Sequence, residues 1–318
     1  MDSHQEVLVS NVLELYEKIS SFEDLNPSKD VNACLSKLVH TCLSSCHIDV
    51  SKLSERVQEK VSRLIKLCGE AEGLLEMHFS TLIGSHEYPL KNLSLFPYYS
   101  NYLKLSHLEF TLLSKACKTI PTNVAFVGSG PLPLSSIILA TNHLKTTSFH
   151  NYDIDPSANA KALQLVSPDP DLSKRMFFHT TDIMNVLGDL KEHEVIFLAA
   201  LVGMDWEEKA RIIQHLAAHM SSGSILLLRS AHGARAFLYP VIDPNDLQGF
   251  EVLSIFHPTD DIVNSVIMAR KDQRPLCSCK GGGFNSTNLP SKCSEIQGFI
   301  PVNHGKIFEE LTMDEQTS

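Results

Sequence analysis

The sequence predicts an α/β protein in which an amino-terminal helical bundle precedes a doubly wound, mostly parallel sheet. Two observations predict it. Over the first ~115 residues apolar residues recur at spacings of three and four, the period of a helix. From Asn123 onward, short β-rich runs alternate with helix-length segments, the pattern of a parallel sheet. We therefore divide the chain into a helical cap domain (1–118), a sheet domain (119–271) and a polar, flexible tail (272–318).

The helical part is expected to be a bundle of about five helices. Apolar residues recur at helical spacing from Val57 to Leu82. Asn26-Pro27-Ser28 and Glu87-Tyr88-Pro89 interrupt the pattern, because proline lacks a backbone donor and restricts the residue before it. We expect turns near residues 26–30, 47–52 and 84–92.

The β-rich runs predict the strands of the sheet. The first five are NVAFVG, TSFHNYDID, MFFHTTD, EVIFLAAL and SILLLRS, with a helix from Asp205 to Met220 before the fifth. They are nearly continuous in apolar residues, as buried parallel strands are. The last two runs, FEVLSIF and IVNSVIMARK, leave no room for a helix between them. We expect them to form an antiparallel hairpin at the edge of the sheet.

Composition and charge exclude several classes of protein. The 318 residues include 27 Lys+Arg and 37 Asp+Glu, a net charge of −10. No window clusters the basic residues that a phosphate backbone requires, so we expect no nucleic-acid partner. No run of about 18 uncharged apolar residues occurs, so we expect no membrane span. The acidic, helix-periodic start is unlike a signal peptide, which favours a cytoplasmic protein.

The eight cysteines are scattered along the chain, as expected for reduced thiols. Cys277, Cys279 and Cys293 could hold zinc only with the distant His304 as fourth ligand. Because no Cys-x-x-Cys pair accompanies them, the sequence favours the absence of a metal site, with zinc as the weaker alternative.

A glycine turn follows the first strand and lies at the default ligand site of an open α/β sheet, beyond the strands' carboxyl ends. It reads Gly128-Ser129-Gly130-Pro131-Leu132-Pro133. The two prolines have no N–H to offer a pyrophosphate, which disfavours NAD. An adenosine ligand without phosphate, such as S-adenosylmethionine, fits better, with Gly128, Ser129, Gly130 and Pro131 as its binding residues. The alternative is that the turn is only a tight connection.

Three aspartates follow the next two strands. Asp153 comes 23 residues after Gly130, near the spacing at which an acidic residue binds both ribose hydroxyls. Asp155, before Pro156, is either a second ligand contact or a helix N-cap. Asp182 follows the third strand, where its carboxylate would accept a hydrogen bond from the adenine amino group; capping is again the alternative.

The helical part supplies a candidate base. Glu72 and Glu76 are four residues apart and therefore share one side of a helix. Glu76 flanks an apolar stripe, which would raise its pKa and favour proton abstraction if it faced a cleft. Its alternative is an ordinary solvated glutamate. The aromatic stretch from Leu95 to Tyr102 suits core packing or a cationic ligand.

One arginine lies at the end of the fifth strand, and a second follows that strand. Arg229 ends that strand, where its guanidinium would point into the ligand crevice and bind a carboxylate. A salt bridge to a local acid is the equal alternative. Arg235 precedes Phe237-Leu238-Tyr239-Pro240, and we place Arg235 and Tyr239 with Arg229 as substrate-binding residues.

Read together, these segments resemble the nicotianamine synthase family, in its plant form. The matching segments follow the family's order over roughly residues 1–270: LLEMHFSTLIG, LFPYYSNYLKLS, VAFVGSGPLPLSSIIL, YDIDPSAN, FLAALVGM, LLLRSAHGARAFLYP and IVNSVIMARK. The turn GSGPLPLS and the segment HGARAFLYP are the most specific.

The resemblance implies a Rossmann-like domain of the S-adenosylmethionine-dependent methyltransferase type beneath a helical cap. It implies that three S-adenosylmethionine molecules condense into the metal chelator nicotianamine, a product tied to iron and zinc homeostasis, with release of three methylthioadenosines. No cofactor beyond this substrate is implied. By position, Glu76 corresponds to the family's base and Tyr102 to the residue that positions the reacting amine. The family's glycine turn corresponds to Gly128 and Gly130. Its ribose-binding acid corresponds to Asp153, and the arginine of its fifth strand corresponds to Arg229.

Two other classes remain open from sequence. A small-molecule methyltransferase would use the same Rossmann-like half, but it would not need the glutamate and tyrosine of the cap. A non-catalytic adenosine-binding regulator would bind without turnover. Products separate the three: methylthioadenosine indicates the synthase, S-adenosylhomocysteine the methyltransferase, and no product the regulator.

Overall fold

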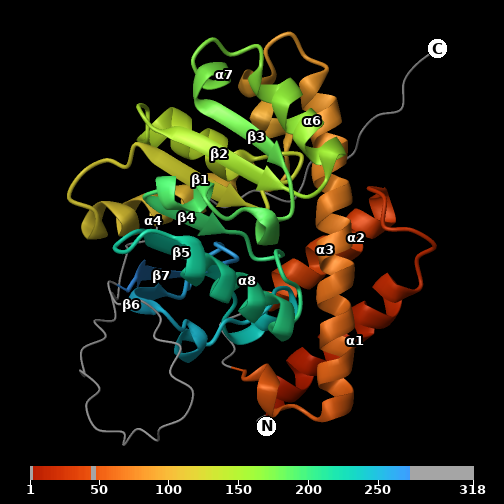
Figure 1. Cartoon of the computed structure of the whole chain (residues 1–318). Coiled ribbons are helices and arrows are strands. Elements are labelled where there is room, and N and C mark those ends of the chain that lie inside the picture. Colours follow the sequence, from red (N-terminus) through yellow and green to blue (C-terminus); the bar gives the residue numbers. More distant parts are fainter. Residues whose placement is uncertain (1–2, 44–47, 273–318) are drawn as a thin grey trace, which may run out of the picture.

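The computed structural model describes residues 3–43 and 48–272 and has an α/β architecture (Figure 1). The described part of the helical segment contains α1 (Ser3–Ser20), α2 (Lys29–Cys42), α3 (Glu55–Gly84) and α4 (Tyr99–Ala116), with 3-10 turns at Val50–Lys52 and Pro89–Leu95. The remaining helices are α5 (Leu134–Ile138), α6 (Pro156–Val166), α7 (Leu172–Arg175) and α8 (Trp206–His219), and a π-helical turn, Leu139–His143, extends α5.

In the described part of the chain, seven strands form one sheet in the order β3-β2-β1-β4-β5-β7-β6. Their bounds are β1 (Asn123–Val127), β2 (Ser148–Asp153), β3 (Met176–Thr180), β4 (Val195–Leu198), β5 (Ile225–Ser230), β6 (Phe250–Phe256) and β7 (Ser265–Lys271). The first five strands are parallel, and β7 pairs antiparallel with both β5 and β6. The doubly wound sheet and its antiparallel edge hairpin are therefore confirmed.

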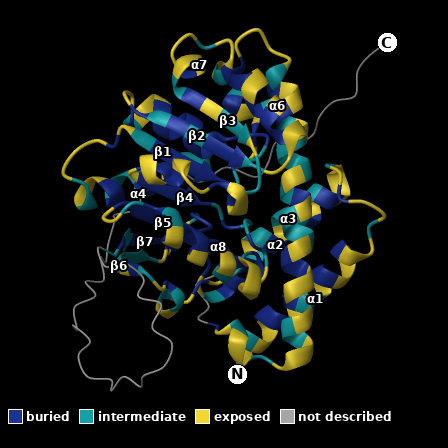
Figure 2. Ribbon diagram, in the orientation of Figure 1, coloured by how far each residue is buried: buried dark blue, intermediate teal, exposed yellow. Residues whose placement is uncertain are grey.

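Alternate side chains of each strand enter two different cores, as the pleat requires. Phe126 of β1 lies in the core that α4 and α5 cover, whereas the next residue, Val127, lies in the core covered by α8. A third core joins α1, α2 and the first half of α3 to Phe237, which follows β5. Figure 2 shows the strands of the sheet mostly in the colours of buried and intermediate residues, and yellow, exposed residues along the outer sides of the helices.

The helical segment has four α-helices in its described part, fewer than the five expected. Helix α3 is 30 residues long because its apolar period continues unbroken from Val57 to Leu82. Figure 1 shows it running past the side of the sheet at which the strand arrows end. Near its start, Lys60 pairs with Glu17 of α1, and at its end the carbonyl of Gly84 accepts a hydrogen bond from Gln164 of α6. One helix thus connects the cap to the ligand-binding edge of the sheet.

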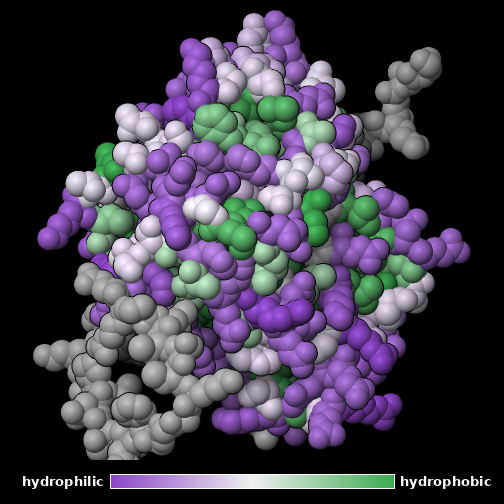
Figure 3. All heavy atoms as spheres, viewed as in Figure 1, coloured by the Kyte–Doolittle hydropathy of each residue, from purple (hydrophilic) through white to green (hydrophobic). Residues whose placement is uncertain are grey.

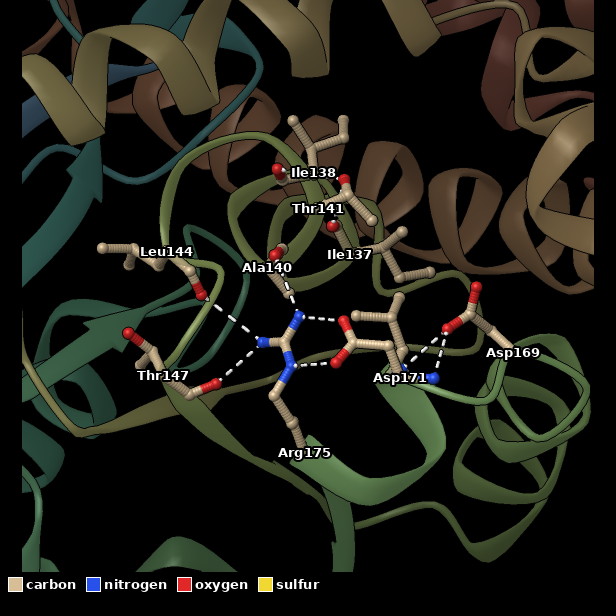
Figure 4. A network of polar contacts seen from close by, with 10 residues as sticks. Ile137, Ile138, Ala140, Thr141, Leu144, Thr147, Asp169, Asp171 and Arg175 are labelled. Atoms are coloured by element: carbon tan, nitrogen blue, oxygen red, sulfur yellow. Dashed lines mark hydrogen bonds and ion pairs between the residues drawn. The ribbon is translucent and has the colours of Figure 1, made fainter.

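Arg175 closes the connection between α5 and β2 (Figure 4). Its guanidinium donates to the carbonyl oxygens of Ala140, Leu144 and Thr147 at 3.1, 3.4 and 2.9 Å. It also pairs with Asp171, at 3.0 Å between Nε and Oδ1. Carbonyls at the end of a helical turn lack partners within the helix. Arg175 therefore satisfies the end of the π-helical turn and fixes the start of β2.

The face seen in Figure 3 is mostly hydrophilic, with hydrophobic residues in small separate groups. Large apolar side chains do reach solvent singly, among them Ile154, Leu187 and Trp206, which is ordinary for a protein surface. Within residues 3–43 and 48–272, every helix is too short or too polar to cross a bilayer.

Candidate active site

The glycine turn after β1 is bent in a way that only glycine tolerates. Gly128 and Gly130 have φ of +77° and +66°, in the left-handed region. A Cβ on Gly128 would lie 2.1 Å from Cγ2 of Val202, and one on Gly130 would lie 2.6 Å from Oε2 of Glu76. The second glycine therefore lets the carboxylate of α3 come directly against the turn.

A cavity of about 670 Å³ opens between this turn and α3. It brings together all of the site residues expected from sequence except Arg235: Glu76, Tyr102, Gly128, Ser129, Gly130, Pro131, Asp153, Asp155, Asp182, Arg229 and Tyr239. Its volume lies in the range typical of small-molecule sites. Residues at or directly after the carboxyl ends of the five parallel strands β1 to β5 line the cavity, as expected for an open α/β sheet.

The aspartates on the sheet side are held by backbone N–H groups. Asp153 accepts from Gly130 at 2.8 Å through one oxygen and from Asp155 at 3.0 Å through the other. Asp155 caps α6 and Asp182 caps a 3-10 turn, so the capping alternative describes both. Each also lines the cavity, and a capping carboxylate keeps lone pairs for a ligand.

Ser129 adds a hydroxyl to the same wall. Its Oγ is buried, lines the cavity and has no hydrogen-bond partner among the described residues. A buried polar atom without a partner is costly, and a ligand hydroxyl or ring nitrogen would satisfy this one.

Glu76 lies in the cavity rather than in solvent. The Tyr102 hydroxyl donates to its Oε1 at 3.2 Å. Desolvation by burial raises the pKa of Glu76 well above its ordinary value, and the nearby charge of Glu72 raises it further. Burial likewise raises the pKa of Tyr102, which keeps that hydroxyl a donor. Such a carboxyl is suited to exchanging a proton with an amine near neutral pH.

Glu72 lies in the cavity as well, one turn before Glu76. The Tyr239 hydroxyl donates to Oε2 of Glu72 at 2.8 Å. Desolvation by burial raises the pKa of both groups. The sequence offered Glu72 only as a neighbour on the same side of a helix; the structure gives it the same type of partner as Glu76.

Arg229 is held by an acid from the helical segment. Its Nε and Nη2 donate to the two oxygens of Glu109 at 2.8 and 3.0 Å, and Nη2 also reaches Oγ of Ser135 at 2.6 Å. The salt-bridge alternative therefore describes this residue, although it also lines the cavity. Its guanidinium carbon lies 5.9 Å from the ring centre of Tyr102.

Arg235 does not reach the cavity. It belongs to a 3-10 turn, Gly233–Phe237, and donates to the backbone carbonyls of Ile262 at 3.1 Å and Asp260 at 2.6 Å. These bonds point the side chain toward the loop before β7. Arg235 therefore holds this loop and lies outside the cavity that the other expected site residues share; its assignment as a substrate-binding residue stays a prediction.

Metal ligands do not gather at this site. Among residues 3–43 and 48–272, no group of three or more His, Cys, Asp and Glu side chains is arranged to hold an ion. Cys277, Cys279, Cys293 and His304 lie outside the described residues, so the zinc alternative stays untested.

Comparison with known proteins places the chain in a family. The family model described as "Nicotianamine synthase protein" matches residues 1–276. A nicotianamine synthase of Solanum lycopersicum is 57% identical over 310 residues, covering 97% of this chain and 98% of that protein. Nicotianamine synthase 3 of Arabidopsis thaliana is 54% identical, covering 99% of both chains. The chain belongs to the nicotianamine synthase family.

Solved structures share the fold of this nicotianamine synthase family member. MtNAS in complex with MTA and tNA superposes with a TM-score of 0.69 at 19% identity, covering 85% of this chain and 99% of that one. A mutant of MtNAS in complex with S-adenosylmethionine gives the same TM-score at 20% identity. This chain and MtNAS therefore share a fold.

Sequence reasoning missed a second cavity in this nicotianamine synthase family member. It measures about 330 Å³ and is lined mostly by apolar residues of α2, α3 and the aromatic stretch before α4. Four polar residues line both cavities: Glu72, Tyr102, Tyr239 and Asn264. The signal for this cavity was the aromatic density around Phe96 and Tyr98, which core packing explained equally well.

Proposed function

We propose that this protein condenses three S-adenosylmethionine molecules into nicotianamine and releases three methylthioadenosines. The reaction transfers aminocarboxypropyl groups and ends in closure of an azetidine ring. The single observation that carries the proposal is the pair of Glu76 and Tyr102 set against Gly130 of the glycine turn. A methyltransferase needs no carboxyl–hydroxyl pair from a helical cap at this point.

The sheet wall would hold the adenosine part of the donor. Asp153 would accept from the ribose hydroxyls, and Asp182 from the adenine amino group, while Gly128 and Gly130 let the ligand approach the backbone. Among the described residues that line the cavity, Arg229 is the one lysine or arginine, and we expect it to bind a carboxylate of the substrate. S-adenosylmethionine is then the substrate, and the reaction needs no further cofactor.

Placement decides which carbon of the sulfonium reacts. The nucleophile is the α-amine of another substrate molecule, which is mostly protonated near pH 7 and must lose a proton first. Glu76 takes that proton, and Tyr102 holds the amine in line with the γ-carbon. The amine forms its bond to this carbon, the carbon–sulfur bond breaks, and its electron pair leaves with methylthioadenosine.

Product analysis tests the proposal. Purified protein is incubated with S-adenosylmethionine, and the products are separated by chromatography and identified by mass. The synthase gives methylthioadenosine and nicotianamine in a ratio of three to one. S-adenosylhomocysteine would assign the protein to the methyltransferases instead, and binding without any product would leave it a regulator. We place the activity in the cytoplasm, with small molecules as its partners and no nucleic acid.

A further inference from the structure

Helix α3 presents two carboxyl groups to the cavity, each with its own tyrosine. Tyr102 of α4 donates to Glu76 at 3.2 Å, and Tyr239 of the segment after β5 donates to Glu72 at 2.8 Å. Residues four apart on a helix lie about 6 Å from one another. The proposed reaction uses only one of these pairs, so the second is unexplained.

The two carboxyl groups differ in position along the cavity, whereas Tyr102, like Tyr239, lines both cavities. Glu76 lies against Gly130, the adenosine end, and does not line the second cavity. Glu72 and Tyr239 line both cavities and so stand at their junction. A ligand that extends from the adenosine end toward the second cavity would pass Glu76 first and Glu72 next.

Asn264 supplies an independent sign of a ligand at this junction. It is 8% exposed, lines both cavities, and its Nδ2 has no hydrogen-bond partner in the described part of the chain. A buried donor left without an acceptor is unfavourable. A carboxylate of the growing product is an acceptor of the required kind, since every unit of that product carries one.

The chemistry of the proposed function, on which this inference rests, has two reaction centres. The intermolecular transfers take place at the γ-carbon of a newly bound donor, beside Glu76. Ring closure instead uses the γ-carbon and the sulfonium of the starting unit, at the other end of the lengthening chain. Its nucleophile is that unit's own nitrogen, by then a secondary amine that must also lose a proton.

We infer that Glu72 is the base for ring closure and that Tyr239 and Asn264 position the starting unit beside it. The secondary ammonium gives one proton to the Glu72 carboxylate. The freed lone pair forms the nitrogen–γ-carbon bond, the γ-carbon–sulfur bond breaks, and its pair passes to sulfur. Methylthioadenosine leaves uncharged, the ring nitrogen keeps its second proton as a tertiary ammonium, and Glu72 later returns its proton to solvent.

The test is the product distribution of Glu72→Gln with S-adenosylmethionine as sole substrate. We expect nicotianamine formation to fall about 100-fold, while release of methylthioadenosine in the first transfers falls less than about threefold. An unclosed condensation product that keeps one methylthioadenosyl group should accumulate, and its mass distinguishes it from nicotianamine. The ratio of methylthioadenosine to nicotianamine then rises above three.

Two further variants separate chemistry from folding. Tyr239→Phe keeps the ring and should show the same unclosed product to a smaller extent, and Glu72→Asp, which keeps a carboxylate, should restore part of the closure. Glu59→Gln, an exposed change on the same helix, should match wild type. If Glu72→Gln and Tyr239→Phe slow every transfer equally, or leave the product ratio unchanged, the inference is wrong. Wild-type protein that makes S-adenosylhomocysteine would instead overturn the proposed function itself.

Discussion

The two walls of the large cavity hold their acids in opposite ways. On the sheet wall, Asp153, Asp155 and Asp182 accept hydrogen bonds from backbone N–H groups. On the helical wall, the hydrogen bonds that Glu72 and Glu76 receive from the described residues come from tyrosine hydroxyls, and burial raises the pKa of both glutamates. The carboxylates of the sheet wall are therefore fixed in direction by backbone donors, whereas the carboxyl groups of the helical wall are ready to take up a proton.

This difference separates binding from proton transfer. Backbone donors stabilise a carboxylate and fix its direction, which suits recognition of ribose and adenine. Desolvation favours the neutral carboxyl and brings its proton affinity toward that of an amine, which suits a base. The comparison predicts that changes on the helical wall act on turnover and changes on the sheet wall act on affinity.

The largest effect is expected where the two walls are joined. Glu109 of α4 and Arg229 of β5 form a buried ion pair, with side chains 1% and 8% exposed. Glu109→Gln leaves the Arg229 charge buried without its partner, and we expect the free energy of unfolding to fall by about 3–5 kcal/mol. Urea denaturation measures it.

The exposed pair of Lys104 and Asp261 is the control for this change. Both side chains are nearly half exposed, so Asp261→Asn should lower the free energy of unfolding by less than about 1 kcal/mol. If Glu109→Gln and Asp261→Asn lowered the free energy of unfolding equally, burial would not determine how much these ion pairs stabilise the protein. Arg229→Lys should also be less stable than wild type, because the ammonium of lysine cannot make the two-point contact that the guanidinium makes with Glu109.

The next effect concerns the base. Glu76→Gln removes proton acceptance and keeps the shape, so release of methylthioadenosine should fall about 100-fold or more while affinity for methylthioadenosine stays unchanged. In wild type, turnover should rise with pH through the raised pKa of Glu76, and the variant should lose this rise. Tyr102→Phe should lower methylthioadenosine release less than Glu76→Gln does, because only the hydroxyl is removed. Wild-type turnover in Glu76→Gln would remove the main support for an active site shared by the cap and the sheet.

A smaller effect is expected on the sheet wall. Asp153→Ala removes an acceptor for ribose hydroxyls and also frees the N–H of Gly130. Calorimetry should show methylthioadenosine binding weaker by about 1–3 kcal/mol. NAD should give no signal with either protein, because two prolines remove donors from the turn. An unchanged affinity in Asp153→Ala would place the ribose elsewhere in the cavity.

The parts of this molecule that sequence could predict are those fixed by local pattern. Strands end where apolar runs meet Gly128, Asp153 and Arg229, and parallel connectivity then brings these residues to one edge of the sheet. Because an open α/β sheet binds ligands at that edge, most of the binding wall followed from sequence order. The resemblance to a family added Glu76 and Tyr102 from the cap.

The partners of these residues could not be predicted, because they come from distant parts of the chain. Glu109 meets Arg229 across 120 residues, and Glu72 meets Tyr239 across 167. No periodicity relates such positions; only the packing of α3 and α4 on the sheet brings them together. The contacts of Arg235 could not be predicted for the same reason, since its acceptors belong to a loop that folds back from before β7.

Lys209 tests whether a pKa shifted by burial is enough to identify a group that transfers protons in the reaction. Its Nζ is buried, donates to the carbonyls of Ala200 at 2.8 Å and Ala199 at 3.3 Å, and does not line the cavity. Desolvation by burial lowers its pKa from 10.5 to about 7. Between those two values the unfolded chain binds more protons than the folded one, so stability should rise with pH by about 1 kcal/mol per unit.

Lys209→Met should abolish this rise, measured as the free energy of unfolding in urea from pH 7 to 10. It should leave the shape of the pH profile of methylthioadenosine release unchanged, because Lys209 touches the turn after β4 and not the substrate. Glu76→Gln should do the reverse, flattening the activity profile at low pH. If Lys209→Met altered the activity profile as well, a buried charge behind the sheet wall would take part in proton transfer. Lining the cavity would then no longer distinguish the groups that transfer protons from those that only affect stability.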